Sequence, residues 1–167
     1  GEVVLNCMNQ DGMRQGYDLP QLTAARQAVT IPIVASGGAG AVEHFRDVFR
    51  DAGVDGLIVS NHGGRQLDSV PSTAVALPGI AEAVGDEIDV LSDGGVRTGL
   101  DVVKMMSLGA KAVLIGRAWA WAVAAGGEEG VGEMLGFLKG DIDTALGLTG
   151  CNSVTELDSS ALYSPAE

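Results

Sequence analysis

Short apolar runs alternate with longer amphipathic stretches along this chain. Each of the five runs is rich in aliphatic and β-branched residues; the runs are Glu2–Asn6, Ile31–Ala35, Gly56–Ser60, Asp89–Ser92 and Ala112–Ile115. Runs of this length without strict alternation are typical of strands buried on both faces, and helices between them favour right-handed crossovers into a parallel sheet. The pattern therefore predicts an α/β fold of five strand–helix units.

Helix boundary residues support this division. Asp18 stands before Leu19 and Pro20 as an N-cap with proline in the first turn, and Ser72 can cap a helix over Thr73–Val84. Glycines that follow the predicted helices act as stops; they are Gly53, Gly85 and Gly109.

Two further helices are predicted after the last strand, over residues 118–125 and 128–148. The apolar residues of the second helix recur at helical spacing and are expected to face the core; they are Met134, Leu135, Leu138, Ile142 and Leu146. Trp119 and Trp121 can be interpreted as a stacking platform, but packing against the core is the favoured interpretation.

The number of strands limits the architecture. A closed (βα) barrel has roughly eight strands and at least ~200 residues, so five units in 167 residues predict a partial TIM barrel with C-terminal helices. We expect a single domain over residues 1–167 that stays open or is completed in a homo-oligomer. The alternative is a rewound, flavodoxin-like doubly wound sheet.

Charge and cysteine usage narrow the function classes. A net charge of −12 disfavours nucleic acid and anionic membranes as partners, so any phosphate site must be built locally from backbone N–H groups and a few arginines. No apolar run approaches the ~20 residues of a membrane span. Cys7 and Cys151 lie far apart with no metal-ligand spacing, which favours free thiols, no metal site and a cytoplasmic protein. The chain begins at Gly1 directly before a strand, which suggests a fragment of something larger.

The loop over residues 60–68 carries the clearest candidate chemistry. His62 and Arg65 follow the third apolar run, separated by Gly63 and Gly64, at the strand end where parallel α/β folds collect their ligands. Imidazole can accept a proton near neutral pH, and guanidinium binds a carboxylate through two parallel hydrogen bonds. A hydroxy acid substrate needs both groups. The alternative is a histidine that bonds the backbone and a solvated arginine.

Three other strand ends carry glycine loops that suit anions. They are Ser36–Gly40 with Gly37 and Gly38, then Asp93–Gly94–Gly95–Val96–Arg97, and finally Gly116–Arg117. Each precedes a predicted helix, whose N-terminus offers unpaired N–H donors to a phosphate that glycine allows to approach closely. The last two loops follow adjacent strands, where TIM barrels commonly bind phosphate. The structural alternatives are tight turns, Asp93 as a cap and Arg97 as a solvated charge.

From Gly56 to about Tyr163 the sequence resembles the FMN-dependent α-hydroxy acid dehydrogenases and oxidases, the family of lactate and mandelate dehydrogenases and glycolate oxidase. The resemblance rests on SNHGGRQLD at 60–68, DGGVRTGLDV at 93–102 and LIGRA at 114–118. It implies oxidation of an L-2-hydroxy acid: His62 is the base that takes a proton as a hydride equivalent passes to FMN N5, and Arg65 binds the substrate carboxylate. It also implies that Ser60 contacts the flavin and that the ribityl and phosphate groups are held by Asp93, Gly94, Gly95, Val96, Arg97, Gly116 and Arg117.

Residues 1–56 are similar to another barrel, the cyclase subunit of imidazole glycerol phosphate synthase. The matching segments are EVVLN at 2–6, NQDG at 9–12, GYDL at 16–19 and IVASGGAG at 33–40, which correspond to that enzyme's sixth and seventh βα units. This resemblance implies a phosphate site at Gly37 and Gly38, with His44 in a structural role. Both families place Asp55–Gly56 before a strand, so we predict a chimera of residues 1–55 and 56–167.

The segments that each family would need for full activity are missing. The strands that carry the cyclase's catalytic aspartates are absent, as is the first half of the flavin family's barrel, and Ser36 aligns with that family's flavin-stabilising lysine. We therefore expect a partial barrel that binds FMN or phosphate, with a 2-hydroxy acid as substrate and with weak or no turnover. The alternatives are a non-enzymatic chimeric or designed scaffold and a phosphosugar-binding remnant of the cyclase.

Overall fold

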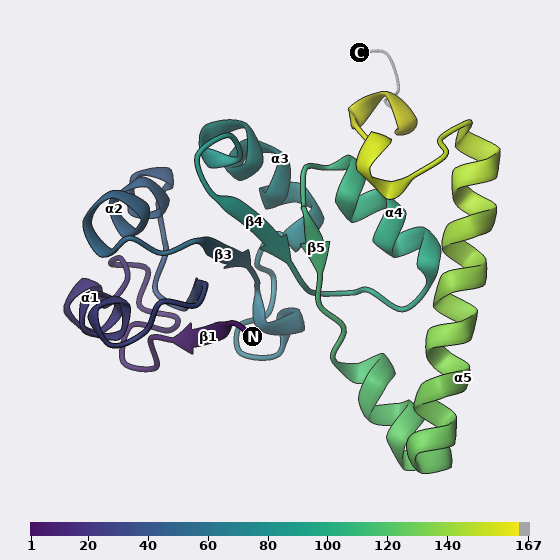
Figure 1. The fold of residues 1–167 in the computed structure, drawn as a ribbon, viewed down its shortest axis with the longest axis horizontal. Helices are drawn as coiled ribbons and strands as arrows, with labels where there is room; N and C mark the ends of the chain where they lie inside the picture. The colour runs from purple at the N-terminus through teal and green to yellow at the C-terminus, as the bar shows by residue number, and fades with distance from the viewer. Residues whose placement is uncertain (164–167) are drawn as a thin grey trace. The chain divides into compact units, whose positions relative to one another are not determined.

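The computed structural model describes residues 1–163 and contains a five-stranded sheet. The strands are β1 (Val3–Asn6), β2 (Ile33–Ser36), β3 (Gly56–Val59), β4 (Asp89–Ser92) and β5 (Ala112–Val113) (Figure 1). Their order in the sheet is β1-β2-β3-β4-β5, the order of their occurrence in the chain. Each of the five predicted apolar runs overlaps a strand, and the predicted strand–helix alternation is confirmed.

The strand order decides between the two predicted architectures. Neighbours in sequence are neighbours in the sheet, as in a (βα) barrel, whereas a flavodoxin-like sheet reverses its strand order after the first unit. The partial barrel is therefore confirmed, and the doubly wound alternative is wrong. Each strand is joined to the next through a helix that returns the chain to the start of the sheet, so no rewinding is needed. Closure by a homo-oligomer stays a prediction.

Two compact units divide the described chain. Unit 1 contains residues 1–59 and 79–91, and unit 2 contains residues 60–78 together with the chain from Ser92 onward. Both α3 (Thr73–Val84) and β4 pass from one unit to the other. The prediction of a single domain over residues 1–167 stays a prediction.

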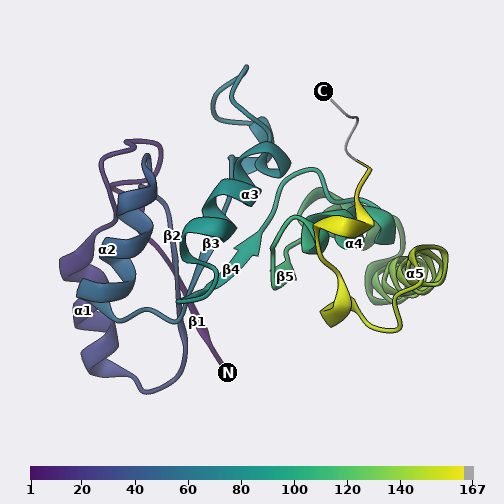
Figure 2. The ribbon, with the colours of Figure 1, turned by 90° about the horizontal axis from the view of Figure 1, so that it is seen from above.

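Unit 1 is built around the parallel pairs β1–β2 and β2–β3. Val3 pairs with Ile33 and Asn6 with Ser36, which sets the register of the first pair. The helices α1 (Leu19–Ala28) and α2 (Val42–Ala52) lie side by side (Figure 2). Leu22 from α1 and Val48 from α2 are fully buried with Ile33 and Leu57 of the strands. The predicted boundary residues function as expected, since Asp18 accepts a hydrogen bond from Gln21 N–H and Gly53 ends α2 in the left-handed conformation.

A partly exposed ion pair joins the end of α1 to the strand starts of unit 1. Arg26 Nη1 lies 2.8 Å from Asp55 Oδ2, and the same carboxylate oxygen accepts a hydrogen bond from Ile33 N–H at 2.8 Å. Arg26 also donates to the carbonyls of Val29 and Ile31. Because Asp55 immediately precedes β3, this network holds the end of α1 and the beginnings of two strands together.

Unit 2 consists chiefly of α4 (Gly99–Ser107) packed along α5 (Arg117–Thr149) (Figures 1 and 2). The helices cross closely at Gly99, where an added Cβ would lie 2.3 Å from Leu138 O and 2.6 Å from Ile142 N. Short 3-10 turns follow at η2 (Val154–Glu156) and η3 (Ser159–Ala161). None of the helices within residues 1–163 combines the length and apolarity that a membrane crossing requires.

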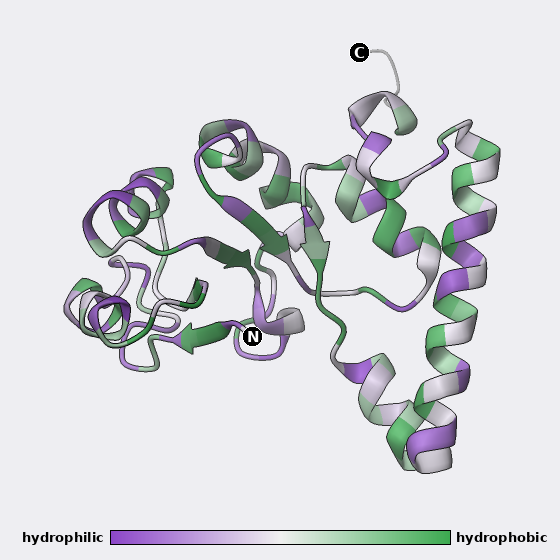
Figure 3. Ribbon diagram, viewed as in Figure 1, coloured by the Kyte–Doolittle hydropathy of each residue, from purple (hydrophilic) through white to green (hydrophobic). Residues whose placement is uncertain are grey.

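The two predicted C-terminal helices are present as parts of α5. The helix is interrupted at Gly126 and Gly127, whose backbone angles are not helical, so the predicted break is confirmed. Of the residues expected to face the core, Leu138 is buried but Leu135 is 53% exposed, so its assignment was wrong. Figure 3 shows hydrophobic and hydrophilic residues mixed along α5, whose buried residues are Leu138 and Ala145.

Candidate active site

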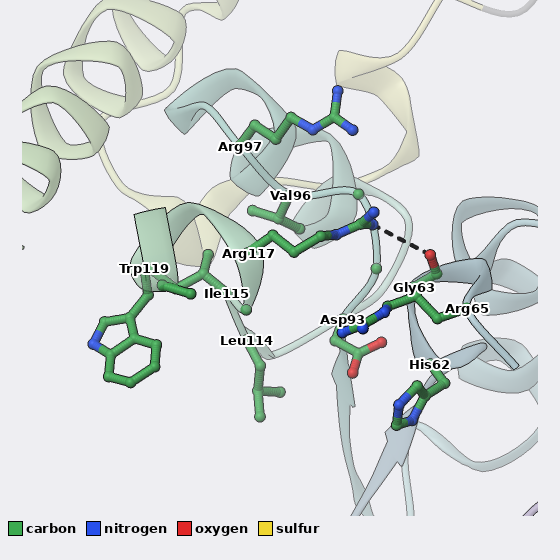
Figure 4. Close-up of a pocket in the computed structure, with 14 residues that line it drawn as sticks. His62, Gly63, Arg65, Asp93, Val96, Arg97, Leu114, Ile115, Arg117 and Trp119 are labelled. Atoms are coloured by element: carbon green, nitrogen blue, oxygen red, sulfur yellow. Dashed lines mark hydrogen bonds between the residues drawn. The ribbon is translucent and has the colours of Figure 1, made fainter. Parts of the chain in front are cut away.

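A pocket of about 440 Å³ lies within unit 2, at three loops that follow strands (Figure 4). The loops are the 3-10 turn η1 (His62–Gly64), the Asp93–Arg97 loop before α4, and the Leu114–Arg117 segment that opens α5. These loops follow β3, β4 and β5, the positions at which ligands bind in parallel α/β folds. Nine predicted site residues line the pocket: His62, Arg65, Asp93, Gly94, Gly95, Val96, Arg97, Gly116 and Arg117.

The η1 turn has an unusual backbone. His62, Gly63 and Gly64 all have positive φ, at 55°, 63° and 70°. Glycine tolerates this conformation, but histidine does so at a cost of roughly 1–2 kcal/mol. Two local hydrogen bonds stabilise the turn: His62 N–H donates to Ser60 Oγ at 3.0 Å, and Gly64 N–H donates to Asn61 Oδ1 at 3.2 Å. The turn exposes the side chains of His62 and Arg65 at the pocket.

The loop after β4 lines the pocket with residues whose backbone donors are unpaired. Gly94 and Gly95 have φ values of 90° and 82°. Among residues 1–163, no protein acceptor pairs with the N–H groups of Gly94, Gly95 or Val96. Successive amides of this kind form an anion-binding concavity. Asp93 adds a carboxylate whose Oδ1 is shielded from solvent and has no hydrogen-bond partner within the described chain.

The start of α4, by contrast, is already capped by carboxylates. Thr98 and Asp101 form a capping box, and Asp101 Oδ2 also accepts a hydrogen bond from Arg97 N–H at 3.1 Å. Gly99 N–H donates to Asp141 Oδ2 of α5 at 3.2 Å. The N–H groups of Thr98, Gly99 and Asp101 therefore already have acceptors, whereas the sequence predicted free donors at this helix start. Within this loop, the unpaired donors belong to the two glycines and Val96.

The capping box also sets the titration of Asp101. Burial alone would raise its pKa, but hydrogen bonds from Arg97 N–H and from the N–H and hydroxyl of Thr98 outweigh burial. The pKa of Asp101 is consequently lowered, and the carboxylate keeps its charge at the α4 N-terminus, where the helix dipole favours an anion.

The start of α5 is open. Gly116, its N-cap, makes no side-chain capping hydrogen bond, and a Cβ built on Gly116 would meet nothing within 4 Å. The guanidinium of Arg117 donates from Nη2 to the carbonyl of Gly63 at 3.2 Å, drawn as the dashed line in Figure 4. This contact joins residues 54 positions apart in the sequence.

The pocket concentrates positive charge in an acidic protein. Three arginines line it, Arg65, Arg97 and Arg117, although the chain carries a net charge of −12. In Figure 4 the Arg97 guanidinium points away from Arg117, whereas His62, Arg65 and Asp93 lie in the same part of the pocket. The arrangement suits a ligand that combines an anionic group with hydroxyl groups, since Asp93 can accept a hydrogen bond from a hydroxyl.

Three predicted site residues lie outside the pocket lining. Ser60 supports η1 through its hydroxyl, and Gly37 and Gly38 belong to unit 1. A Cβ on Gly37 would lie 2.6 Å from Asn6 Oδ1, and one on Gly38 would lie 2.3 Å from Gly16 O. Close packing against the loop after β1 thus explains both glycines without a ligand. His44 accepts a hydrogen bond from Gly40 N–H at Nδ1, which agrees with the structural role expected of it.

The pocket also contains apolar residues that the sequence reasoning missed. Leu114, Ile115 and Trp119 form part of its lining. Trp119 is 51% exposed and Trp121 is 74% exposed, so the preference for core packing was wrong for both. The available signal was the position of Trp119 in the first turn of the helix that Gly116 opens, which places it beside any ligand of that helix start.

Comparison with known proteins agrees with this geometry. The model of the FMN-dependent dehydrogenase family matches residues 7–164. The chain belongs to the FMN-dependent dehydrogenase family. FMN is the cofactor of that family, as the family's description states.

Individual relatives and solved structures support the assignment. An L-lactate dehydrogenase from a Caulobacter species is 57% identical over 112 residues, which cover 67% of this chain and 30% of that protein. An L-lactate dehydrogenase from Xanthomonas campestris is 53% identical over 120 residues, which cover 72% of this chain and 31% of that protein. A crystal structure of mandelate oxidase with 3,3-difluoro-2-hydroxy-3-phenylpropionic acid is 43% identical, with a TM-score of 0.76. The match covers 86% of this chain and 41% of that one.

These matches bear on the predicted seam. The family model extends through Asp55–Gly56 into the first strand–helix units, and the matches give no support to a cyclase origin for residues 1–55. The chain spans about a third of the length of the lactate dehydrogenases that it matches.

Proposed function

We propose that this chain forms the phosphate-binding and substrate-carboxylate-binding part of an FMN-dependent L-2-hydroxy acid dehydrogenase or oxidase. The observation that carries the proposal is the set of unpaired amides at Gly94, Gly95 and Val96, three residues that line a pocket together with three arginines. Family membership and the names of the relatives, L-lactate dehydrogenase and mandelate oxidase, support the choice of cofactor and substrate class.

The residues of the pocket fit FMN. Gly95 and Gly116 leave open space where a Cβ would stand, so a phosphate can approach both backbone segments. Arg117 can supply charge to a phosphate dianion, with Arg97 elsewhere on the pocket lining, and the orphaned Oδ1 of Asp93 can accept a hydrogen bond from a ribityl hydroxyl. A volume of about 440 Å³ lies within the usual range for small-molecule sites.

The remaining polar residues suit a 2-hydroxy acid. Arg65 can grip the substrate carboxylate through two parallel N–H donors, and this grip orients the carbinol carbon. The exposed imidazole of His62 lies in the same pocket, within unit 2, and takes the proton that the carbinol group releases. When bound, FMN supplies the two-electron acceptor for this oxidation.

Turnover is a separate question from FMN binding. The chain spans about a third of the length of its lactate dehydrogenase relatives. For the 167-residue chain we propose FMN binding with weak or no turnover. The alternative hypothesis is a scaffold that binds phosphate without catalysis.

Comparison of FMN with riboflavin tests the proposal. Riboflavin carries the same ring and ribityl chain but lacks the phosphate, so the proposed cradle predicts that the 167-residue chain binds FMN at least about tenfold more tightly. Quenching of flavin fluorescence measures both affinities. Equal affinity for the two flavins, or no binding of FMN, would contradict the proposal.

Catalysis is tested separately with the His62→Ala variant. Anaerobic L-lactate or L-mandelate should bleach the flavin absorbance slowly in the parent chain and not in the variant, while both bind FMN equally. If the flavin absorbance is not bleached in either protein although FMN is bound, the scaffold hypothesis is favoured.

A further inference from the structure

We propose that Arg117 is a positioning residue that ties the His62 turn to the anion site. The inference rests on the proposed function, because it assigns a second task to a residue that would also hold the FMN phosphate. The observation is the hydrogen bond from Arg117 Nη2 to the Gly63 carbonyl, 3.2 Å long, between the first residue of α5 and the middle of η1.

The η1 turn needs external support. Three successive positive φ angles, one of them at His62, place the turn in a conformation that an isolated peptide rarely adopts. The hydrogen bonds that Ser60 Oγ and Asn61 Oδ1 accept are local to the turn. Arg117 instead reaches the turn from another element, and so fixes it relative to the helix start that lines the same pocket.

The glycine at position 63 permits this contact. A Cβ built there would lie 3.1 Å from Arg117 Nη2, closer than ordinary contact distance, and the φ of 63° also disfavours any other residue. Because Gly63 has no side chain, the Arg117 guanidinium can reach its carbonyl oxygen. The two glycines of the SNHGGR sequence also allow flexibility between His62 and Arg65.

The guanidinium can serve two partners at once. Arginine carries five N–H donors in a rigid plane, and one bond to Gly63 leaves the others free for an anion in the pocket. An anion held by Arg117 restricts that side chain and thereby strengthens its bond to the turn. By reciprocity, a well-formed turn strengthens anion binding. Phosphate occupancy would thus order the histidine that carries the proposed proton transfer.

Amide hydrogen exchange of residues 60–68 in the flavin-free chain tests the tether. Arg117→Ala should accelerate exchange of the Gly64 and Arg65 amides by about 3- to 10-fold, the factor that corresponds to loss of one exposed hydrogen bond. The matched control is Arg97→Ala, which removes an equal charge from the same pocket but no side-chain hydrogen bond among the described residues. The control should leave exchange of the turn unchanged.

The Arg117→Lys variant provides a second test. It keeps the positive charge but loses the planar guanidinium with its several N–H donors. Inorganic phosphate should slow exchange of the turn in the parent chain and fail to do so in Arg117→Lys, whose single ammonium cannot hold both partners in the same geometry. This variant also carries the test if circular dichroism shows that Arg117→Ala does not fold.

The outcomes separate this inference from the proposed function. The tether proposal would be wrong, even if FMN binds, if folded Arg117→Ala exchanged the amides of the turn at the rate of the parent chain. It would also be wrong if Arg97→Ala accelerated their exchange equally. Conversely, selective loosening by Arg117→Ala in a chain that binds no FMN would support the tether and reject the flavin proposal.

Discussion

The crossing of α4 and α5 at Gly99 provides a sharp test of the packing that holds the site. Gly99 follows the Asp93–Arg97 loop by two residues, so its position sets where the unpaired amides lie. A Cβ at Gly99 would approach Leu138 O at 2.3 Å, Asp141 Cβ at 2.5 Å and Ile142 N at 2.6 Å. Two of these three atoms are helix backbone and cannot rotate away. We predict that Gly99→Ala forces the helices apart.

The size of the effect follows from two opposing contributions. Overpacking of this kind costs about 1–3 kcal/mol, and separation of the helices also weakens the Gly99–Asp141 hydrogen bond by about 1 kcal/mol. Alanine is a better helix former than glycine, but the gain of up to ~1 kcal/mol applies to helix interiors, and Gly99 is the first residue of α4. We therefore expect a net loss of about 2–3 kcal/mol in the free energy of unfolding.

Gly140→Ala is the matched control. Gly140 lies inside α5, and a Cβ there meets nothing within 4 Å, so the same substitution should stabilise the helix by about 0.5–1 kcal/mol. Both tryptophans lie in α5, so urea titration followed by tryptophan emission reports on unit 2. With an m-value of about 2 kcal/mol/M, the two midpoints should differ by roughly 1–2 M, in opposite directions from the parent. A Gly99→Ala midpoint at or above that of the parent would refute the close crossing.

Two further predictions concern other parts of the chain. Because the pKa of Asp101 is lowered in the folded protein, its contribution to stability is present above the ordinary carboxyl value of 3.8 and disappears as the pH falls through the lowered value. The stability advantage of the parent over Asp101→Asn, measured by urea titration, should therefore be constant near neutral pH and shrink below pH 4; an advantage that grows on acidification would contradict this sign. In unit 1, Asp55→Ala removes both the Arg26 ion pair and the acceptor for Ile33 N–H and should cost about 1–3 kcal/mol by circular dichroism. Asp55→Asn, which can still accept from Ile33, should recover part of the loss, and equal losses in the two variants would show that the backbone contact contributes little.

Local patterns in the sequence were sufficient to predict the strands and helices and to identify the loops that line the pocket. An apolar run such as Gly56–Val59 has no polar residues to place on a solvent-facing side, so it forms a buried strand. The carboxyl end of this strand determines where the turn that begins at His62 lies. Asp18 and Gly53 act as caps because capping depends on residues within one turn of the helix end. Parallel strands bring their carboxyl ends to one edge, which is why loops distant in sequence line one pocket.

Contacts between distant residues could not be predicted in the same way. Asp141 caps α4 from a position 42 residues away, and nothing near Thr98 in sequence signals that a second carboxylate takes the next amide. The exposure of Trp119 likewise depends on which elements cover α5, and hydrophobicity alone predicts burial for any tryptophan. The Gly37–Gly38 loop looked like a phosphate site because glycine serves close backbone packing and close ligand approach equally well.

The capping of α4 changes how an anion would be recognised in this pocket. If the helix start supplied the donors, the phosphate would compete with Asp101 and Asp141 for the same N–H groups, and two carboxylates nearby would repel it. Because those carboxylates are already satisfied by α4, the amides of Gly94, Gly95 and Val96 are left for the ligand, together with the uncapped start of α5. The acidic residues therefore act as fixed supports for the loop, and the selectivity for an anion comes from backbone donors and arginines. This division of roles explains how a chain of net charge −12 can present a cationic pocket at this one edge of its sheet.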